Sequence, residues 1–343
     1  MLRSRVCSVL LTVLVSLGAA ACGSSGDEPP GSSGGAGGAA GSGGVGGAAG
    51  SAGSGGAAGA RSIPFACPGG TIADGANTLT IDGTERTFYA DLPEHPTGKV
   101  GVVFSWHGYG DTAENHRAAL HFEPDGDPAH PLIVMTPVDS GLEPLGAGKI
   151  GLAWDIRAGK PGDDNVDFPF FEAMLGCVAA QQPLDPARVY SFGFSAGSVF
   201  TSLLASRYPR LFAATVHESG AWMNDPAEAA LVKVLTIDWS WPELEPADRG
   251  NVLLTHGGTT DEVGAGSIKV FNLEESAKAA LPFLAAAKRT VIDCEHDGGH
   301  VLHPELTSAL ILKYLTLHRA GEGSPFVSGA LEGFPGSCSL HLP

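Results

Sequence analysis

Ser195 is the central residue of Gly193-Phe194-Ser195-Ala196-Gly197, a G-x-S-x-G pattern of the kind that can present a nucleophilic serine. The pentapeptide alone is weak in a chain with 49 glycines, and a second match is centred on Ser33 in a Gly- and Ser-rich stretch. Residues 189–192 before Ser195 have a strand pattern, and the residues from Ala196 onward have a helical one. The context therefore predicts a sharp strand-serine-helix turn with the helix N-terminus beneath the serine. The alternative is a tight glycine turn with a solvent-facing serine.

A serine hydroxyl becomes a good nucleophile only with a general base, which is in turn oriented by an acid. After a strand-serine-helix turn the expected chain order is serine, then Asp or Glu, then His. Asp261 and His300 fit this order, and each follows the carboxyl end of a predicted strand, where open α/β sheets place their sites. We expect Ser195, Asp261 and His300 to form a triad, with Glu262 and Asp238 as the alternative acids.

An oxyanion hole is the second requirement of acyl transfer. The backbone N–H of Ala196, directly after the serine, would pair with an N–H from the loop that ends an early strand. That loop is Trp106-His107-Gly108-Tyr109-Gly110, and we expect Tyr109 to be the second donor. His107 is expected in the pocket, with a buried imidazole that braces the loop as the structural alternative.

Three tryptophans could line the site or pack in the core. Trp106, Trp154 and Trp222 are candidates for an apolar acyl pocket or an aromatic platform, and core packing is the alternative for each. The less regular stretch 222–250, which contains Trp239 and Trp241, is expected to form a lid or a pocket wall.

His296, His300 and His303 raise the alternative of a metal site. The three would share a face only on a helix, and the Gly298-Gly299 pair argues against a helix there. We therefore expect no metal and no cofactor.

The chain from about Cys67 onward alternates between strand and helix patterns. Asp82-Gly83 between two short apolar runs predicts a hairpin. The following strands are so apolar that they fit a mostly parallel sheet buried on both faces; they are residues 100–105, 132–136, 188–192, 213–217, 252–255 and 289–293. Helical patterns cover residues 167–181, 195–208, 274–288 and 304–318. The expected fold is α/β, with an N-terminal antiparallel hairpin and helices on both faces of the sheet.

The N-terminal sixty residues do not resemble a folded domain. Arg3 and Arg5 precede an apolar run, so residues 1–21 are expected to be a cleaved signal peptide. The small residues before Cys22 resemble a bacterial lipobox, although Ala19 stands where Leu is usual, and lipidation of Cys22 is expected. Residues 22–61 are almost entirely Gly, Ala and Ser and predict a flexible tether. Residues 62–343 would form the catalytic domain.

Composition limits the partners. The chain has 343 residues and a formal net charge of −17, so it lacks the basic clusters that nucleic acids require, and we expect no nucleic-acid partner. Cys67, Cys177, Cys294 and Cys338 form an even set in a chain with an export signal, which predicts two disulfides with three possible pairings.

Several segments together resemble secreted polyhydroxybutyrate depolymerases and feruloyl esterase-like α/β-hydrolases. They are Trp106-His-Gly-Tyr-Gly, Asp164-Asn-Val-Asp-Phe, the G-F-S-A-G turn, Thr255-His-Gly-Gly-Thr-Thr-Asp and Gly-Gly-His300, in this order. The resemblance covers most of residues 67–343. It implies an α/β-hydrolase fold and a serine ester hydrolase with Ser195 as nucleophile, Asp261 as acid and His300 as base. The segment Leu302-His303-Pro304, where the family often has an aromatic-proline pair, departs from the pattern.

The resemblance also guides the remaining expectations. It favours the disulfides Cys177–Cys294 and Cys67–Cys338. The implied substrates are feruloyl or acetyl esters of polysaccharide, or hydroxyalkanoate polyester. Apart from the resemblance, we expect an exported monomer that meets a membrane only through its lipid anchor. The alternatives are a peptidase of the same fold and a non-catalytic surface lipoprotein that binds a polymer.

Overall fold

The computed structural model describes residues 61–142, 152–157, 165–231, 241–246, 250–265 and 268–343. The expected signal peptide, Cys22 and all of the tether except Arg61 lie outside these residues, as do Asp238 and Trp239. The described residues belong to the unit Arg61–Pro343.

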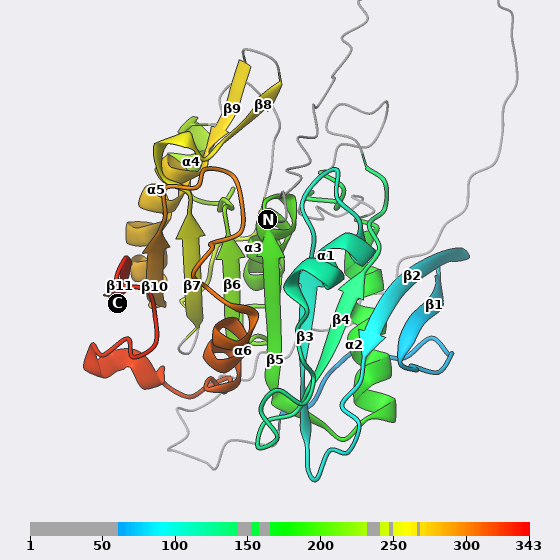
Figure 1. Cartoon of the computed structure of the whole chain (residues 1–343). Helices are drawn as coiled ribbons and strands as arrows, with labels where there is room; N and C mark the ends of the chain where they lie inside the picture. The colour runs from blue at the N-terminus through cyan, green and yellow to red at the C-terminus, as the bar shows by residue number, and fades with distance from the viewer. Residues whose placement is uncertain (1–60, 143–151, 158–164, 232–240, 247–249, 266–267) are drawn as a thin grey trace, which may run out of the picture. The chain divides into compact units, whose positions relative to one another are not determined.

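A nine-stranded sheet forms the centre of this unit (Figure 1). Across the sheet its strands are β1 (Gly75–Ile81), β2 (Thr84–Asp91), β4 (Leu132–Pro137), β3 (Val100–Trp106), β5 (Leu184–Phe194), β6 (Ala214–Glu218), β7 (Asn251–His256), β10 (Thr290–Glu295) and β11 (Cys338–His341). The six strands from β4 to β10 are parallel, while β1, β2 and β11 pair antiparallel at the two edges. The mostly parallel sheet with an N-terminal hairpin confirms the predicted fold class.

Helices cover both faces of the sheet. They are α1 (Ala113–Leu120), α2 (Asp167–Gln181), α3 (Ala196–Arg207), α4 (Pro226–Leu231), α5 (Leu273–Ala286) and α6 (Ser308–Thr316). The helices α1 and α6 lie on the near face in Figure 1, and α2, α3 and α5 lie on the far face. A separate two-stranded hairpin, β8 (Glu262–Ala265) and β9 (Ile268–Asn272), follows β7.

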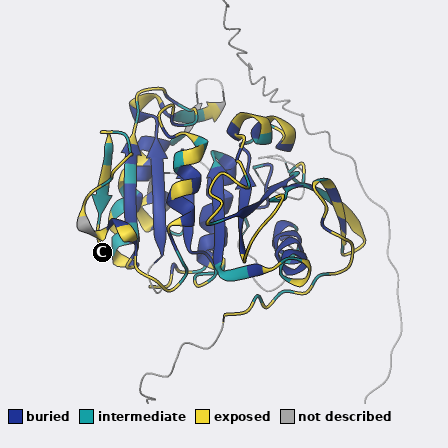
Figure 2. Ribbon diagram, turned by 60° about the horizontal axis from the view of Figure 1, so that its bottom comes forward, coloured by how far each residue is buried: buried dark blue, intermediate teal, exposed yellow. Residues whose placement is uncertain are grey.

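The central strands are apolar throughout, and their side chains point alternately to the two faces of the sheet, which explains this layered arrangement. Val102 and Phe104 of β3 join the core beneath α2 and α3, whereas Val103 joins the core on the opposite face. Successive side chains of a strand point to opposite faces, so a continuous apolar run requires cover on both. Figure 2 shows the central strands as the most completely buried part of the molecule.

Some boundaries differ from the predicted ones. Helix α6 begins at Ser308 rather than at residue 304, because Thr307 is the N-cap and its side chain accepts the N–H of Leu310. The strand β11 and the β8–β9 hairpin were not predicted from the sequence. Both are short and carry little apolar alternation.

The disulfide pairing predicted from the resemblance is wrong. The structure forms Cys67–Cys177 and Cys294–Cys338 in place of Cys177–Cys294 and Cys67–Cys338. Cys177 belongs to the core beneath α2 and α3, whereas Cys294 belongs to the core on the opposite face, so the sheet separates them. Cys294 is instead directly opposite Cys338 in the β10–β11 ladder.

The partner of Cys177 is set by close packing between α2 and the segment that precedes β1. A Cβ atom built on Gly176 would lie 2.5 Å from the carbonyl oxygen of Ala66. Glycine at this position therefore lets the backbone of residues 65–67 run against the helix, which brings Cys67 to Cys177.

Within the described ranges, no helix combines the length and the apolar composition needed to cross a bilayer.

Candidate active site

The predicted strand-serine-helix turn is present at the junction of β5 and α3. Ser195 has φ 54° and ψ −119°, a conformation that L-residues rarely adopt. The turn is tight, because a Cβ atom on Gly193 would lie 2.2 Å from the carbonyl oxygen of Gly197. A Cβ atom on Gly197 would in turn lie 2.1 Å from the carbonyl oxygen of Trp106. Glycine at these two positions is therefore a steric requirement of the turn.

The structure brings Ser195, His300 and Asp261 together from three separate loops. His300 Nε2 lies 2.9 Å from Ser195 Oγ, and His300 Nδ1 lies 2.7 Å from Asp261 Oδ1. Asp261 is fully buried, whereas the His300 side chain is 25% exposed. This geometry can pass a proton from the serine hydroxyl to an imidazole whose other nitrogen is held by a carboxylate.

Asp261 is held in its ionised form by hydrogen bonds. Burial acts to raise the pKa of Asp261, but the bonds from His300, the Gly257 N–H and the Ser219 hydroxyl outweigh it and leave the pKa below its ordinary value. Oδ2 accepts both the Gly257 N–H and the Ser219 hydroxyl at 2.8 Å. The carboxylate is thus fixed in orientation and stays charged at neutral pH.

The loops that carry Asp261 and His300 are packed directly on each other. Asp261 follows β7 through the short 3₁₀ turn Gly258–Thr260. The N–H of Gly299 donates to the carbonyl of Gly257 at 3.1 Å, and a Cβ atom on Gly257 would lie 1.9 Å from the carbonyl oxygen of Gly299. This backbone contact sets the spacing between the acid and the histidine.

The predicted oxyanion loop lies beside the serine. A Cβ atom built on Gly108 would lie 3.2 Å from Ser195 Cβ, so the loop backbone approaches Ser195 closely. Ala196 is the first residue of α3, and the N–H groups of a first helical turn have no intrahelical acceptor. Tyr109 is half-buried next to Gly108. Ala196 and the loop that carries Tyr109 thus both lie next to Ser195, and their role as oxyanion donors stays a prediction.

His107 is a buried brace of this loop. Its Nδ1 lies 2.9 Å from the carbonyl oxygen of Gly108, and its Nε2 lies 3.3 Å from Asp139 Oδ2. The Trp154 indole N–H donates to the carbonyl of His107 at 2.9 Å. With no exposed surface, His107 supports the loop instead of lining an open pocket, which corrects its placement in the predicted pocket.

The three candidate pocket tryptophans are core residues, so the expectation that they line the pocket is also wrong. Trp106 and Trp154 have no exposed surface, and Trp222 is 2% exposed. The Trp106 indole donates to Ser191 Oγ at 3.0 Å, and its ring packs edge-on against Trp154 and Phe200. Their aromatic area stabilises the layer beneath the site. Trp241 of the expected lid is buried as well and donates to a backbone carbonyl.

The alternative assignments gain no support from the described residues. Glu262 lies on β8 in an ion pair with Lys269 and does not contact His300 in any hydrogen bond of the described part. The rings of His296 and His303 contact each other at 4.8 Å, while His300 is directed at Ser195 and Asp261. No group of three His, Cys, Asp or Glu side chains among the described residues is arranged to hold a metal ion.

Sequence reasoning missed two residues at the end of β6. Ser219 donates its hydroxyl to Asp261, and Glu218 is a buried carboxyl beside the serine turn. Nothing in the local sequence Glu218-Ser219-Gly220 distinguishes it from an ordinary loop, so no motif could have identified them. The Asp164-Asn-Val-Asp-Phe segment was noted only for its resemblance. Asn165 Oδ1 accepts the N–H groups of Asp167 and Phe168 at the start of α2, and Asp167 forms a buried ion pair with Arg86.

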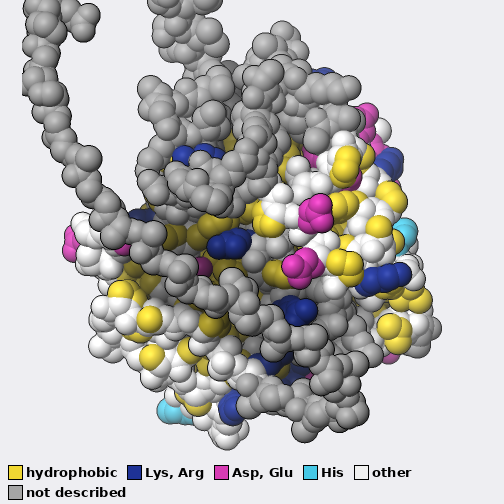
Figure 3. All heavy atoms as spheres, turned by 180° about the vertical axis from the view of Figure 1, so that it is seen from behind, with side chains coloured by type: hydrophobic (Ala, Val, Ile, Leu, Met, Phe, Trp, Pro, Cys, Tyr) yellow, Lys and Arg dark blue, Asp and Glu magenta, His cyan; other side chains and the backbone are white. Residues whose placement is uncertain are grey.

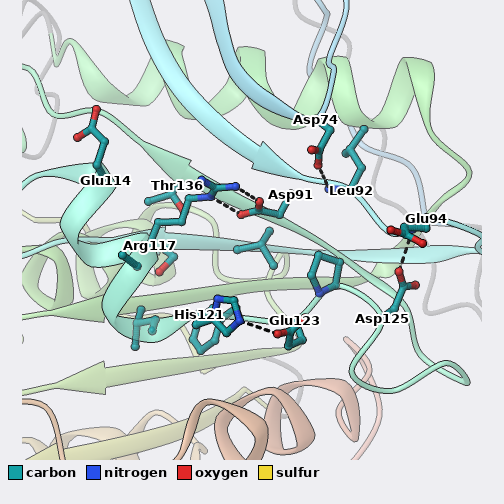
Figure 4. A pocket seen from close by; sticks show the side chains of 16 residues that line it. Asp74, Asp91, Leu92, Glu94, Glu114, Arg117, His121, Glu123, Asp125 and Thr136 are labelled. Atoms are coloured by element: carbon teal, nitrogen blue, oxygen red, sulfur yellow. Dashed lines mark hydrogen bonds and ion pairs between the residues drawn. The ribbon is translucent and has the colours of Figure 1, made fainter.

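Two surface features lie away from the triad. A hollow of about 640 Å³ lies between β2, α1 and the loop after α1, and it is lined by carboxylates (Figure 4). Two of these carboxylates have basic partners: Asp91 accepts from Arg117, and Glu123 lies 2.8 Å from His121 Nε2. On the face opposite to that of Figure 1, Lys and Arg side chains are dispersed among apolar, acidic and neutral ones (Figure 3).

A mostly parallel sheet with a serine turn after β5, an acid after β7 and a histidine after β10 defines an α/β-hydrolase. Residues 157–236 match the family model described as Esterase PHB depolymerase, which confirms the resemblance indicated by the motifs. The chain is also similar to an oxidized polyvinyl alcohol hydrolase of Sphingopyxis sp. (strain 113P3), with 30% identity over 193 residues. That match covers 49% of this chain and 52% of the relative, so it spans about half of the relative's length.

Solved structures share the fold. The crystal structure of native pOPH has a TM-score of 0.64 at 21% identity and covers 81% of this chain and 97% of that chain. The crystal structure of native sOPH has a TM-score of 0.63 at 20% identity and covers 81% of this chain and 98% of that chain. These likenesses establish the architecture, while the chemistry rests on the site.

Proposed function

We propose that the protein is a serine carboxylic-ester hydrolase with Ser195 as nucleophile, His300 as general base and Asp261 as the orienting acid. The observation that carries the proposal is the unbroken relay from Ser195 Oγ to His300 Nε2 at 2.9 Å and from His300 Nδ1 to Asp261 at 2.7 Å. The matches to ester-hydrolase families support the same chemistry.

The reaction proceeds through an acyl-enzyme. His300 takes the proton of Ser195 as Oγ attacks the ester carbonyl carbon, and Asp261 stabilises the imidazolium that forms. The N–H groups of Ala196 and Tyr109 hold the oxyanion. His300 then gives its proton to the departing alcohol oxygen, and a water molecule, activated by His300 in the same way, releases the acid and restores Ser195.

The substrate class that fits best is a polymer-linked or short-chain ester: feruloyl or acetyl esters of polysaccharide, or hydroxyalkanoate polyester. The family-model match supports a polyester. Oxidised polyvinyl alcohol is a second candidate, because a relative described as its hydrolase shares 30% identity over 193 residues.

The working location is outside the cytoplasm, on a lipid anchor at Cys22 with residues 22–61 as the tether. Two disulfides support an oxidising compartment, since such bonds are rare in the reducing cytosol. Mass spectrometry of the mature N-terminus tests the anchor, and a chain that starts elsewhere without a lipid on Cys22 would exclude it.

Hydrolysis of p-nitrophenyl acetate and methyl ferulate by the full chain tests the activity, with Ser195→Ala as the control. We expect hydrolysis by the wild type and none above background by the variant. An inactive wild type on both esters and on a hydroxybutyrate oligomer, or a variant that keeps its rate, would overturn the proposal. A p-nitroanilide substrate cleaved faster than the esters would identify a peptidase instead.

A further inference from the structure

Glu218 ends β6 beside the candidate nucleophile and carries a carboxyl group that the steps above do not use. The residue is 1% exposed. Its main-chain carbonyl accepts the N–H of Ser195 at 2.9 Å, in continuation of the β5–β6 ladder. Its side-chain Oε2 accepts the N–H of His303 at 2.9 Å. A single residue therefore contacts both the serine turn and the segment that carries His300.

The loop that carries His300 has attachments on both sides of the histidine. On one side, the N–H of Gly299 donates to the carbonyl of Gly257 at 3.1 Å. On the other side, His303 is attached to β6 through the Glu218 carboxyl. His300 lies between these two attachments. Loss of the second would remove the hydrogen bond that holds the segment after His300 to β6.

A carboxyl group at this place is unfavourable for stability alone. Oε1 of Glu218 has no hydrogen-bond partner among the described residues, and an apolar side chain of the same size would avoid burying it. Burial raises the pKa of Glu218 to about 8, although the His303 N–H acts to lower it, so the group is mostly neutral at pH 7. A costly buried acceptor aimed at the histidine loop indicates a role in positioning.

We infer that Glu218 is a positioning residue that sets the distance from His300 to Ser195 by holding the histidine loop against β6. The inference rests on the proposed ester hydrolysis. Ser219 strengthens it, because the next residue along the chain donates to Asp261 at 2.8 Å. Glu218 and Ser219 together therefore contact Ser195, Asp261 and the loop that carries His300.

Three variants at one position separate positioning from packing. Glu218→Gln keeps an oxygen that can accept the His303 N–H. Glu218→Met has a similar length without such an acceptor, and Glu218→Ala removes the side chain. With p-nitrophenyl acetate, we expect kcat to fall about 10- to 100-fold in the Met and Ala variants with KM changed less than about twofold, because a base displaced by about 1 Å costs on this order. The Gln variant is expected to stay within about threefold of wild type.

Glu228 on α4 provides a matched control. It is also 1% exposed, its Oε1 accepts one hydroxyl, that of Ser276, at 2.9 Å, and its Oε2 has no partner within the described part of the chain. Glu228→Met is expected to retain wild-type kcat even if its unfolding temperature falls. A second readout is the rate of Ser195 modification by a fluorophosphonate, which needs no natural substrate and is expected to fall in parallel with kcat.

The outcomes separate the two proposals. Wild-type kcat in Glu218→Met, equal losses in Glu218→Met and Glu218→Gln, or an equal loss in Glu228→Met would overturn the positioning role while the esterase proposal stands. If Glu218→Ala does not fold, the comparison of Met with Gln decides alone. An inactive wild type, or an active Ser195→Ala variant, would instead overturn the proposed function.

Discussion

Gly197 is packed directly against the backbone of Trp106. A Cβ atom on Gly197 would lie 2.1 Å from the Trp106 carbonyl oxygen and 2.7 Å from that of His107. The first turn of α3 and the early loop after β3 are therefore in contact through bare backbone. Because Ala196 begins that turn and Tyr109 follows in that loop, this contact fixes the spacing of the two candidate oxyanion donors.

Gly197→Ala is expected to damage stability and activity together. The new methyl group meets backbone atoms that no rotamer change can move, so α3 and the loop must separate, at a cost of about 1–3 kcal/mol. The free energy of unfolding by urea and kcat for p-nitrophenyl acetate would both fall. Gly98→Ala is the control, because a Cβ atom there meets nothing within 4 Å. Equal changes in unfolding free energy and kcat for Gly197→Ala and Gly98→Ala would contradict the packing argument.

Asp261→Asn is expected to lower kcat about 10³- to 10⁴-fold with little change in KM. An amide is neutral, so it no longer stabilises the imidazolium form of His300 and favours the wrong imidazole tautomer. Glu262→Gln serves as the comparison, since that carboxylate pairs with Lys269 on the β8–β9 hairpin. If kcat fell strongly in Glu262→Gln while Asp261→Asn stayed active, Glu262 and not Asp261 would be the acid that orients His300.

Glu218 is expected to make stability depend on pH. Burial raises the pKa of Glu218 from 4.5 to about 8, so the folded protein keeps a proton that the unfolded chain releases between these values. The free energy of unfolding therefore falls as pH rises from about 4.5 to about 8 and then levels off. The unfolding temperature of wild type relative to Glu218→Gln should fall across this window, by about 2–4 °C per kcal/mol. A difference that does not change with pH would show that Glu218 has the same pKa in the folded protein as in the unfolded chain, and would contradict the prediction.

The two disulfides are expected to contribute similar stability through different loops. Cys294–Cys338 closes a separation of 44 residues and Cys67–Cys177 one of 110. Loop-closure entropy gives roughly 4 kcal/mol for the first and roughly 5 kcal/mol for the second. Peptide mapping without reductant should recover these two cross-links. Urea unfolding of Cys294→Ser/Cys338→Ser and Cys67→Ser/Cys177→Ser double variants measures each contribution, and a cross-link between Cys177 and Cys294 would contradict the structure.

The sequence was informative where chemistry depends on local pattern and chain order. The apolar runs predicted the parallel strands, because strands buried on both faces need apolar side chains throughout. The serine turn, Asp261 and His300 could be selected because each follows a strand end in the expected order. The structure places His300 within hydrogen-bonding distance of both Ser195 and Asp261.

The sequence was silent where the outcome depends on which face of the sheet a side chain occupies. The positions of Cys177 and Cys294 along the chain do not reveal that the sheet separates them. Tryptophan is a residue type common in binding pockets, but the indoles of Trp106 and Trp154 are fully buried in the core. Glu218 accepts a backbone N–H from a distant loop, and almost any residue type at position 303 would supply that N–H, so the sequence does not reveal the contact.

The positions of the two disulfides have a mechanical consequence. Cys67 lies before the edge strand β1 and is bonded to α2, while Cys338 lies in the edge strand β11 and is bonded to β10. Tension applied to the chain on the N-terminal side of Cys67 would pass through a covalent bond into α2 before it loads β1. Tension applied on the C-terminal side of Cys338 would first load the rest of β11 and then pass through the disulfide into β10. A pull from the N-terminal side would thus bypass the edge strand β1 and reach a helix that is packed into the core.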